Sequence, residues 1–165
     1  IARSVLSRRW ARHLFSETGM PEYAIRWRDE ETGLGCRILV DWFDRLCLDL
    51  KTTGDASPPG FAKTCVRFGY HRKKYFYSQG LRALNGRDTP LLHIAVSVEP
   101  PFASGAYEIR DKDRNGRSLG ERQVRRAMKQ IAECRESGDY SDSWEHEVIS
   151  LDMPTFAYAE DQYAL

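Results

Sequence analysis

Hydrophobic and polar residues alternate through the stretch from Gly35 to Thr53 in the manner of two β-strands. Two apolar runs flank a short polar segment at 43–45, which predicts a strand, a tight reversal and a second strand. Because strand side chains alternate between faces, Asp49 and Lys51 are neighbours on the face opposite Leu50. We therefore expect this hairpin to be the centre of the fold and to present charged groups near its reversal.

The remaining elements follow from periodicity and from glycine and proline breaks. In chain order we expect a helix over 4–17, a strand containing 23–27, the central hairpin, a loop over 54–60, a helix over about 61–84, strands over 91–99 and 106–110, and a helix opening at the capping box Ser118–Glu121. The strand over 91–99 should have one polar side. The last helix should bury a stripe formed by Val124, Ala127, Met128 and Ile131.

This order of elements predicts an α/β (α+β) fold. It should form a single domain, residues 1–165, with a central mixed β-sheet flanked by helices and the acids at the edge of the sheet. The loop over 54–60 directly follows Lys51 and is a candidate wall of a substrate channel.

Charge is distributed unevenly along the chain. From Phe61 to Arg87 there are seven basic residues and no acid, whereas residues 132–165 hold nine acids and one arginine. One face of the basic helix is predicted to carry Val66, Tyr70, Lys73, Tyr77 and Leu81. A basic block can bind a polyanion such as nucleic acid, although alone it could equally be a solvated face.

The acidic C-terminal segment, about 139–165, is expected to pack as a strap over the domain. Its aromatic residues are irregularly spaced at Trp144, Phe156, Tyr158 and Tyr163.

Composition indicates an ordinary soluble globular protein of 165 residues, 41% hydrophobic and 30% charged, with a formal net charge of +1. No apolar run approaches the ~20 residues needed to cross a membrane, and the N-terminal arginines are not followed by an apolar signal core. The four cysteines are scattered without a C-x-x-C pair, which favours reduced, mostly buried thiols. We therefore expect a cytoplasmic protein.

The chemistry that the sequence offers is concentrated in the central hairpin. Asp41 lies shortly before the reversal, so the hairpin can bring its carboxylate towards Asp49 and Lys51. Carboxylates suit a hard divalent cation such as Mg²⁺, and a lysine beside them can stabilise the charge that builds on a phosphate under attack. The sequence has no glycine-rich phosphate loop, G-x-S-x-G elbow or H-E-x-x-H motif. Nucleotide hydrolysis, serine hydrolysis and zinc proteolysis therefore lack support.

Asp41 followed by Asp49-Leu50-Lys51 resembles the motif of the PD-(D/E)XK nuclease superfamily. The surrounding sequence resembles the exodeoxyribonuclease VIII (RecE)-like and lambda-exonuclease-like branch, through segments at 21–27, 32–37, 49–53, 69–72, 76–77 and 95–101. The resemblance implies Mg²⁺-dependent hydrolysis of DNA phosphodiester bonds, with Mn²⁺ able to substitute, by an exonuclease acting on duplex ends in phage-type recombination or repair.

The resemblance also implies roles for individual residues. Asp41, Asp49 and Lys51 are the expected catalytic residues. Asp41 and Asp49 would hold the metal together with the carbonyl of Leu50 and with Glu22. Lys51 would orient or deprotonate the attacking water and stabilise the phosphorane charge. The expected DNA-binding residues are Arg72, Lys73, Lys74 and Tyr77.

Two positions depart from the family pattern. Val40 stands where a proline usually precedes the first aspartate, a change that affects backbone shape rather than chemistry. Lys73 stands where this branch usually has a glutamine, four residues before Tyr77. This second change alters how the basic helix would meet DNA and Lys51.

The resemblance further implies double-stranded DNA ends as a partner, a ring-shaped homo-oligomer, a single-strand annealing protein as a second partner, and a bacterial or phage-infected cell. Two alternatives remain open. One is a non-catalytic DNA-binding or assembly module that retains the nuclease fold. The other is a glycosidase using Asp41 and Asp49, which would leave the basic helix without a task.

Overall fold

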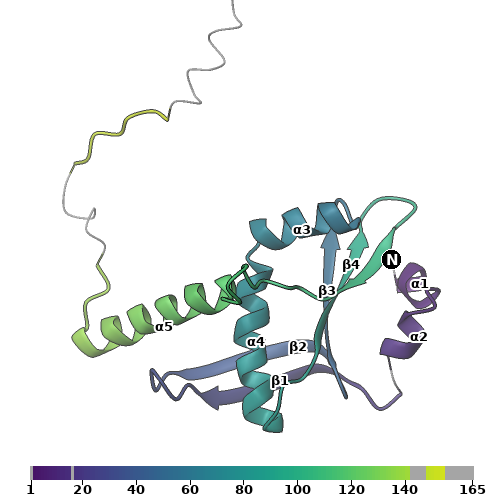
Figure 1. The fold of residues 1–165 in the computed structure, drawn as a ribbon, viewed down its shortest axis with the longest axis horizontal. Coiled ribbons are helices and arrows are strands. Elements are labelled where there is room, and N and C mark those ends of the chain that lie inside the picture. Colours follow the sequence, from purple (N-terminus) through teal and green to yellow (C-terminus); the bar gives the residue numbers. More distant parts are fainter. Residues whose placement is uncertain (1, 16, 142–147, 155–165) are drawn as a thin grey trace, which may run out of the picture. The chain divides into compact units, whose positions relative to one another are not determined.

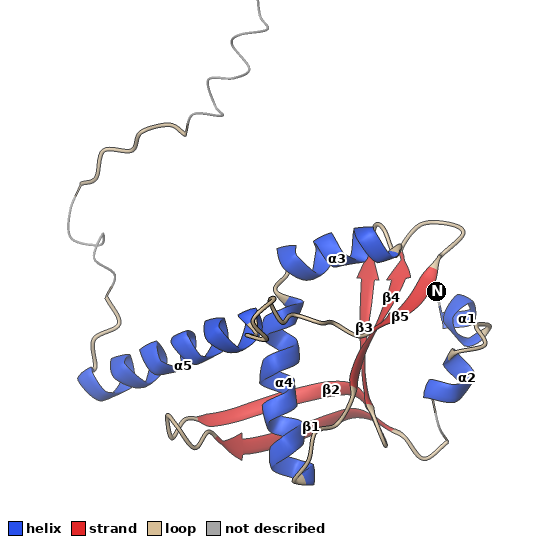
Figure 2. Cartoon of the chain, in the orientation of Figure 1, coloured by secondary structure: helices blue, strands red, loops and turns tan. Residues whose placement is uncertain are grey.

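The computed structural model describes residues 2–15, 17–141 and 148–154. Its elements are α1 (Ala2–Leu6), α2 (Ala11–Leu14), β1 (Met20–Arg28), β2 (Gly35–Phe43), β3 (Cys47–Thr53), α3 (Pro58–Arg67), α4 (Tyr70–Asn85), β4 (Leu91–Ser97), β5 (Ser104–Tyr107) and α5 (Leu119–Ser137). Figure 1 colours them along the chain and Figure 2 by type. The predicted central hairpin is confirmed as β2 and β3.

The strands form one five-stranded sheet in the order β1-β2-β3-β4-β5. Neighbouring strands are antiparallel except for β3 and β4, which are parallel because α3 and α4 carry the chain back between them. The mixed sheet flanked by helices confirms the predicted fold class. The expectation that the acids lie at the edge of the sheet was wrong, because β4 and β5 continue the sheet beyond β3 and leave β2 and β3 in its interior.

Helix α4 covers one face of the sheet where it crosses β1 and β2, as Figure 2 shows. Leu81 is fully buried there against Ile38 and Val40. Gly80 allows the close approach, since a Cβ at this position would lie 2.8 Å from Ile38 Cδ1 and 2.8 Å from Trp27 Cζ3. The helix that carries the basic residues is thereby held firmly against the strand that carries Asp41.

The opposite face of the sheet is covered by the N-terminal segment. Val5 and Ala11 pack with Leu48, Ile94 and Val96 in a separate core cluster. The single helix predicted over 4–17 is instead two short helices, α1 and α2, joined by a turn. Because β4 is covered on both faces, every residue of this strand but Leu92 is buried, including those on the side predicted to be polar.

Gly69 separates α3 from α4, so the continuous helix predicted over 61–84 was wrong. Gly69 has φ 67°, in the left-handed region that glycine adopts without steric cost, and it caps the start of α4. The break places Val66 and Tyr70 on different helices. Val66 is 73% exposed, whereas Tyr70 packs against buried Phe61. The helical spacing of the apolar residues did not reveal the change of direction.

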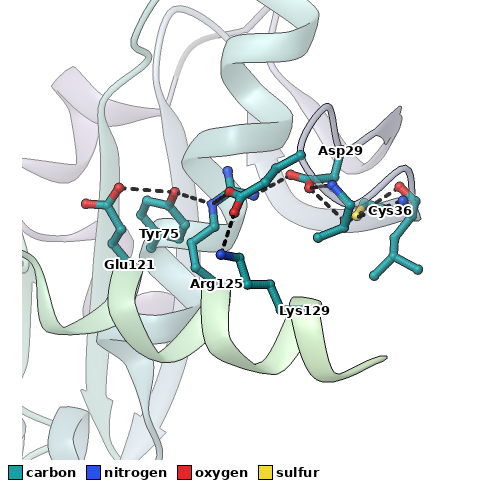
Figure 3. A network of polar contacts seen from close by, with 9 residues as sticks. Asp29, Cys36, Tyr75, Glu121, Arg125 and Lys129 are labelled. Atoms are coloured by element: carbon teal, nitrogen blue, oxygen red, sulfur yellow. Dashed lines mark hydrogen bonds and ion pairs between the residues drawn. The ribbon is translucent and has the colours of Figure 1, made fainter. Parts of the chain in front are cut away.

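Helix α5 is tied to the sheet by the polar network of Figure 3. Arg125 donates to Asp29 Oδ2 at 2.6 Å and to the Tyr75 hydroxyl at 3.0 Å. Burial raises the pKa of Asp29, but hydrogen bonds from Arg125 and Thr32 outweigh it and hold the pKa below its ordinary value. The network therefore clamps α5 to α4 and to the turn that follows β1.

The start of α5 matches its predicted capping box, since the Glu121 amide donates to Ser118 Oγ at 3.0 Å. The prediction of which residues α5 buries was only partly confirmed. Met128 is 7% exposed, whereas Ile131 is 50% exposed and Ala127 also faces solvent.

The chain divides into two units, Ile1–Glu133 and Cys134–Leu165. The whole sheet belongs to the first unit. Most of the predicted acidic strap, including Trp144, Phe156, Tyr158 and Tyr163, lies outside the described residues. No helix among the described residues is long and apolar enough to span a membrane. Cys36, Cys47 and Cys65 are buried free thiols, as expected.

Candidate active site

The candidate site lies where β2 and β3 separate. The two strands pair only at Trp42 with Leu48 and at Phe43 with Cys47, beside the reversal. One step further along this register Asp41 stands opposite Asp49. There the Asp41 side chain replaces a backbone partner of β3, because its Oδ2 accepts a hydrogen bond from the backbone N–H of Leu50 at 2.6 Å. The sheet thus opens at the point where its two central acids face each other.

Asp49 is fully buried and has an ammonium group on each of its oxygens. Lys51 Nζ lies 2.5 Å from Oδ2, and Lys73 Nζ lies 2.6 Å from Oδ1. Burial raises the pKa of Asp49, but the two lysines outweigh it and lower the pKa below its usual value. The carboxylate is therefore charged, and α4 supplies half of its compensation.

Lys51 makes three contacts around the opening. Besides Asp49, its Nζ donates to the carbonyl of Leu50 at 2.9 Å and lies 5.4 Å from the centre of the Tyr70 ring. Burial lowers the pKa of Lys51 and the nearby charge of Lys73 lowers it further, while Asp49 opposes both. The ammonium is held beside both proposed metal-binding groups of β3 and is partly withdrawn from water.

His93 is a site residue that the sequence did not single out. It is the register partner of Asp49 on the parallel strand β4, and its Nε2 lies 3.5 Å from Asp49 Oδ2. Burial lowers the pKa of His93 to about 4, which leaves the ring neutral at pH 7. Neither ring nitrogen has a hydrogen-bond partner among the described residues. Strand alternation predicts His93 on the polar side of its strand, but only the pairing of β3 with β4 places it beside Asp49.

Glu22 stands on β1 with a backbone φ of 49°, which is uncommon for a residue other than glycine. Its neighbours Pro21 and Tyr23 pair with Trp42 and Val40, so the register sets Glu22 opposite Asp41. Such irregular backbone is often found at functional sites. Glu22 is exposed, and its role as a metal ligand remains a prediction.

The predicted DNA-binding residues of α4 separate into two groups. Lys73 points to Asp49 and lies 4.7 Å from the Tyr77 ring centre, while the Tyr77 hydroxyl donates to the Leu39 carbonyl at 2.8 Å. Both side chains are therefore engaged inside the site. Arg72 is exposed and Lys74 half-buried, and neither forms an ion pair with a described residue. These two remain candidates for phosphate contacts.

The residues present fit a hard divalent cation in their chemistry. Magnesium is commonly bound through one or two carboxylates while it retains several waters. Asp41, Asp49 and the Leu50 carbonyl can provide the protein ligands of such a site. No group of three or more His, Cys, Asp or Glu side chains suited to a metal occurs in the described part of the chain. A thiol site is disfavoured, because burial, followed by the charges of Asp49 and Asp41, raises the pKa of Cys47 to about 12.

A mixed sheet that opens between two central strands, with an acid on one and Asp-x-Lys on the other, defines the PD-(D/E)XK nuclease class of folds. A family model described as "PDDEXK-like domain of unknown function (DUF3799)" matches residues 1–146. The chain belongs to this family, and the predicted superfamily is confirmed. The narrower exodeoxyribonuclease VIII-like and lambda-exonuclease-like branch stays a prediction.

A solved structure from Eubacterium rectale, described as a "Putative exonuclease", has a similar fold with a TM-score of 0.64 and 13% sequence identity. The match covers 99% of this chain and 63% of that one, so the present chain spans less than two thirds of its neighbour's length. At this identity the similarity concerns the fold alone. A search of curated proteins returned no match.

Proposed function

We propose that the protein is a Mg²⁺-dependent deoxyribonuclease that hydrolyses DNA phosphodiester bonds. The observation that supports this most directly is the meeting of Asp41, Asp49 and Lys51 at the opening between β2 and β3. A buried carboxylate costs free energy unless it is paired, so an acid placed in the interior beside a second acid and two lysines needs a reason beyond stability. Cation-assisted attack on a phosphate gives each of these groups a task.

Asp41, Asp49 and the Leu50 carbonyl would hold the cation in this proposal. Mg²⁺, when bound, supplies Lewis-acid stabilisation of the phosphate and lowers the pKa of water. Lys51 would turn its ammonium from the Leu50 carbonyl towards the attacking water or a phosphate oxygen, a donor role that is strongest in a site partly withdrawn from water. Glu22 would add an outer carboxylate next to Asp41.

We further propose an exonuclease that acts on duplex ends, in phage-type recombination or repair, in the cytoplasm. The resemblance to the exodeoxyribonuclease VIII-like and lambda-exonuclease-like branch supports this refinement, together with a ring-shaped homo-oligomer and a single-strand annealing protein as partner. Arg72 and Lys74 would bind phosphates of the incoming DNA.

The test is incubation of the purified protein with linear and with closed circular duplex DNA, in Mg²⁺ or in EDTA. An end-dependent nuclease degrades only the linear form and only with Mg²⁺. The matched control is Asp41→Asn, in which the amide oxygen can still accept the Leu50 N–H while the negative charge is lost. Cleavage by this variant at the wild-type rate would contradict the proposed nuclease function. Cleavage of closed circular DNA by the wild-type protein would contradict the proposed dependence on DNA ends.

One observation favours the alternative of a non-catalytic DNA-binding module. Both oxygens of Asp49 already have a lysine partner, so the carboxylate is compensated without a cation. Titration calorimetry with Mn²⁺ distinguishes a nuclease from a non-catalytic DNA-binding module. A nuclease site binds Mn²⁺ and loses binding in Asp41→Asn, whereas the module binds DNA equally well with or without the cation.

A further inference from the structure

A groove that no functional role yet explains lies beside the end of β3. It has a volume of about 550 Å³, within the range of ligand sites, and it is bounded by α3 on one side and by the end of β3 on the other. Its lining includes Thr52, which directly follows Lys51, so the groove begins one residue away from the candidate active site.

The polar part of the groove suits an anion. Lys63 and Arg67 stand one helical turn apart on α3, both exposed, and neither forms an ion pair with a described residue. Thr53 and Thr64 lie side by side in the lining, with their hydroxyl oxygens 3.3 Å apart, and their hydroxyls donate to the backbone carbonyls of Asp55 and Gly60. Asp55 and Glu99, the acids close by in sequence, are not part of the lining. Two exposed cations one helical turn apart form a surface complementary to phosphate.

The apolar part is an aromatic ring that reaches solvent. Phe68 is 59% exposed, and its ring lies 6.0 Å from the Tyr70 ring at an interplanar angle of 22°. Arg67 lies 5.3 Å from the centre of the Phe68 ring. Since Lys51 lies 5.4 Å from the centre of the Tyr70 ring, a chain of contacts runs from the catalytic lysine through Tyr70 to Phe68.

We propose that this groove is a subsite for single-stranded nucleic acid, in which a base stacks on Phe68 while Lys63 and Arg67 bind the flanking phosphates. The inference rests on the proposed nuclease function and extends it, because it names where the strand continues beyond the scissile phosphate. A base with bound phosphates on both sides is internal to its strand, and inside a duplex the faces of such bases are covered by their neighbours, so stacking on Phe68 requires an unpaired base. The subsite therefore takes a strand that has already separated from its complement.

The experiment measures binding of a fluorescein-labelled oligo-dT to the full chain in EDTA, where cleavage does not interfere. Phe68→Leu keeps an apolar side chain and removes the stacking ring, so the dissociation constant should rise about 5- to 150-fold. Lys63→Ala with Arg67→Ala should flatten the slope of log affinity against log salt by about 1.4. The matched control is Val66→Ala on the same helix, which is 73% exposed and does not line the groove.

A second readout detects the stack itself. An oligonucleotide carrying 2-aminopurine should be quenched by the wild-type protein and by Phe68→Trp, and much less by Phe68→Leu. Equal binding by Phe68→Leu and Val66→Ala, or quenching that survives Phe68→Leu, overturns the subsite. If linear duplex DNA is still degraded in that case, the subsite fails and the nuclease proposal stands. Absence of any DNA binding or cleavage defeats both.

Discussion

At the scale of single residues, Asp49 is the group on which the site depends. A fully buried carboxylate needs partners, and here Lys51 and Lys73 supply them from two different elements. Strand alternation predicts that Asp49 and Lys51 are neighbours. The contact with Lys73 is not visible in the sequence, because it depends on where Gly69 restarts the helix and on how closely α4 packs against the sheet.

In the proposed site, Lys73 and a divalent cation would compete for the Asp49 carboxylate, which gives a test at this position. Lys73→Gln removes a positive charge from Asp49, so the affinity for Mn²⁺ should rise by about 10-fold or more. Titration calorimetry or the loss of the free Mn²⁺ signal in electron paramagnetic resonance measures it. Lys74→Gln, the next residue on α4, forms no ion pair with Asp49 and should change the affinity much less. An unaltered or weaker affinity in Lys73→Gln would contradict the proposed competition.

At the scale of elements, the strands were predicted better than the helices. The hairpin β2–β3 and strand β4 follow from alternation and from proline and glycine breaks, whereas β5, predicted over 106–110, runs from Ser104 to Tyr107. The prediction of the helices was wrong where a single residue changes the direction of the chain. Gly69 splits the predicted helix into α3 and α4, and the segment before Phe15 forms two short helices. The order of the strands in the sheet could not be predicted from the hydrophobic pattern either, because the parallel pairing of β3 with β4 joins segments distant in sequence.

The clamp on α5 gives a prediction for stability against pH. Arg125→Ala removes the guanidinium partner of buried Asp29, which keeps only its hydrogen bonds from Thr32, and should lower the free energy of unfolding by about 2 kcal/mol at neutral pH. The folded-state pKa of Asp29 is lowered, so the contribution is complete above the ordinary value of 3.8 and is lost as the pH falls through the folded pKa. Denaturant unfolding of both proteins should therefore show the difference shrinking only below about pH 4.

The control for this clamp is Arg117→Ala, whose ion pair with Asp113 is exposed to solvent and should contribute much less to the free energy of unfolding. A difference between Arg125→Ala and wild type that persists unchanged into strong acid would mean that packing, and not the ion pair, holds α5.

The exposed side of α4 gives a second prediction at this scale. Because Lys73 is engaged with Asp49, the salt-sensitive part of duplex binding should come from its neighbours. Arg72→Ala with Lys74→Ala should weaken binding to any DNA sequence and reduce the slope of log affinity against log salt by about 1.8. Fluorescence anisotropy at several salt concentrations measures both quantities. A slope that does not change would show that this side of the helix does not meet DNA.

At the scale of the whole molecule, the sequence predicted the nuclease superfamily and the acid–acid–lysine motif, and the family match confirms the superfamily. The sequence did not predict the opening between β2 and β3, the position of His93, or the groove beside Thr52. Each arises from strands or helices that meet only after folding. The proposed function requires that the residues gathered at this opening carry out chemistry on DNA.

The most direct measurement is the single-turnover rate of cleavage of linear duplex DNA by Lys51→Ala, with DNA affinity and melting temperature recorded for the same preparation. Lys73 remains on Asp49 in this variant, so the carboxylate keeps one counter-charge and the protein should stay folded. A donor that acts in the transition state leaves DNA affinity nearly intact when removed, while the rate falls by about 10² to 10³. A folded, DNA-binding Lys51→Ala protein that cleaves at the wild-type rate would contradict the account.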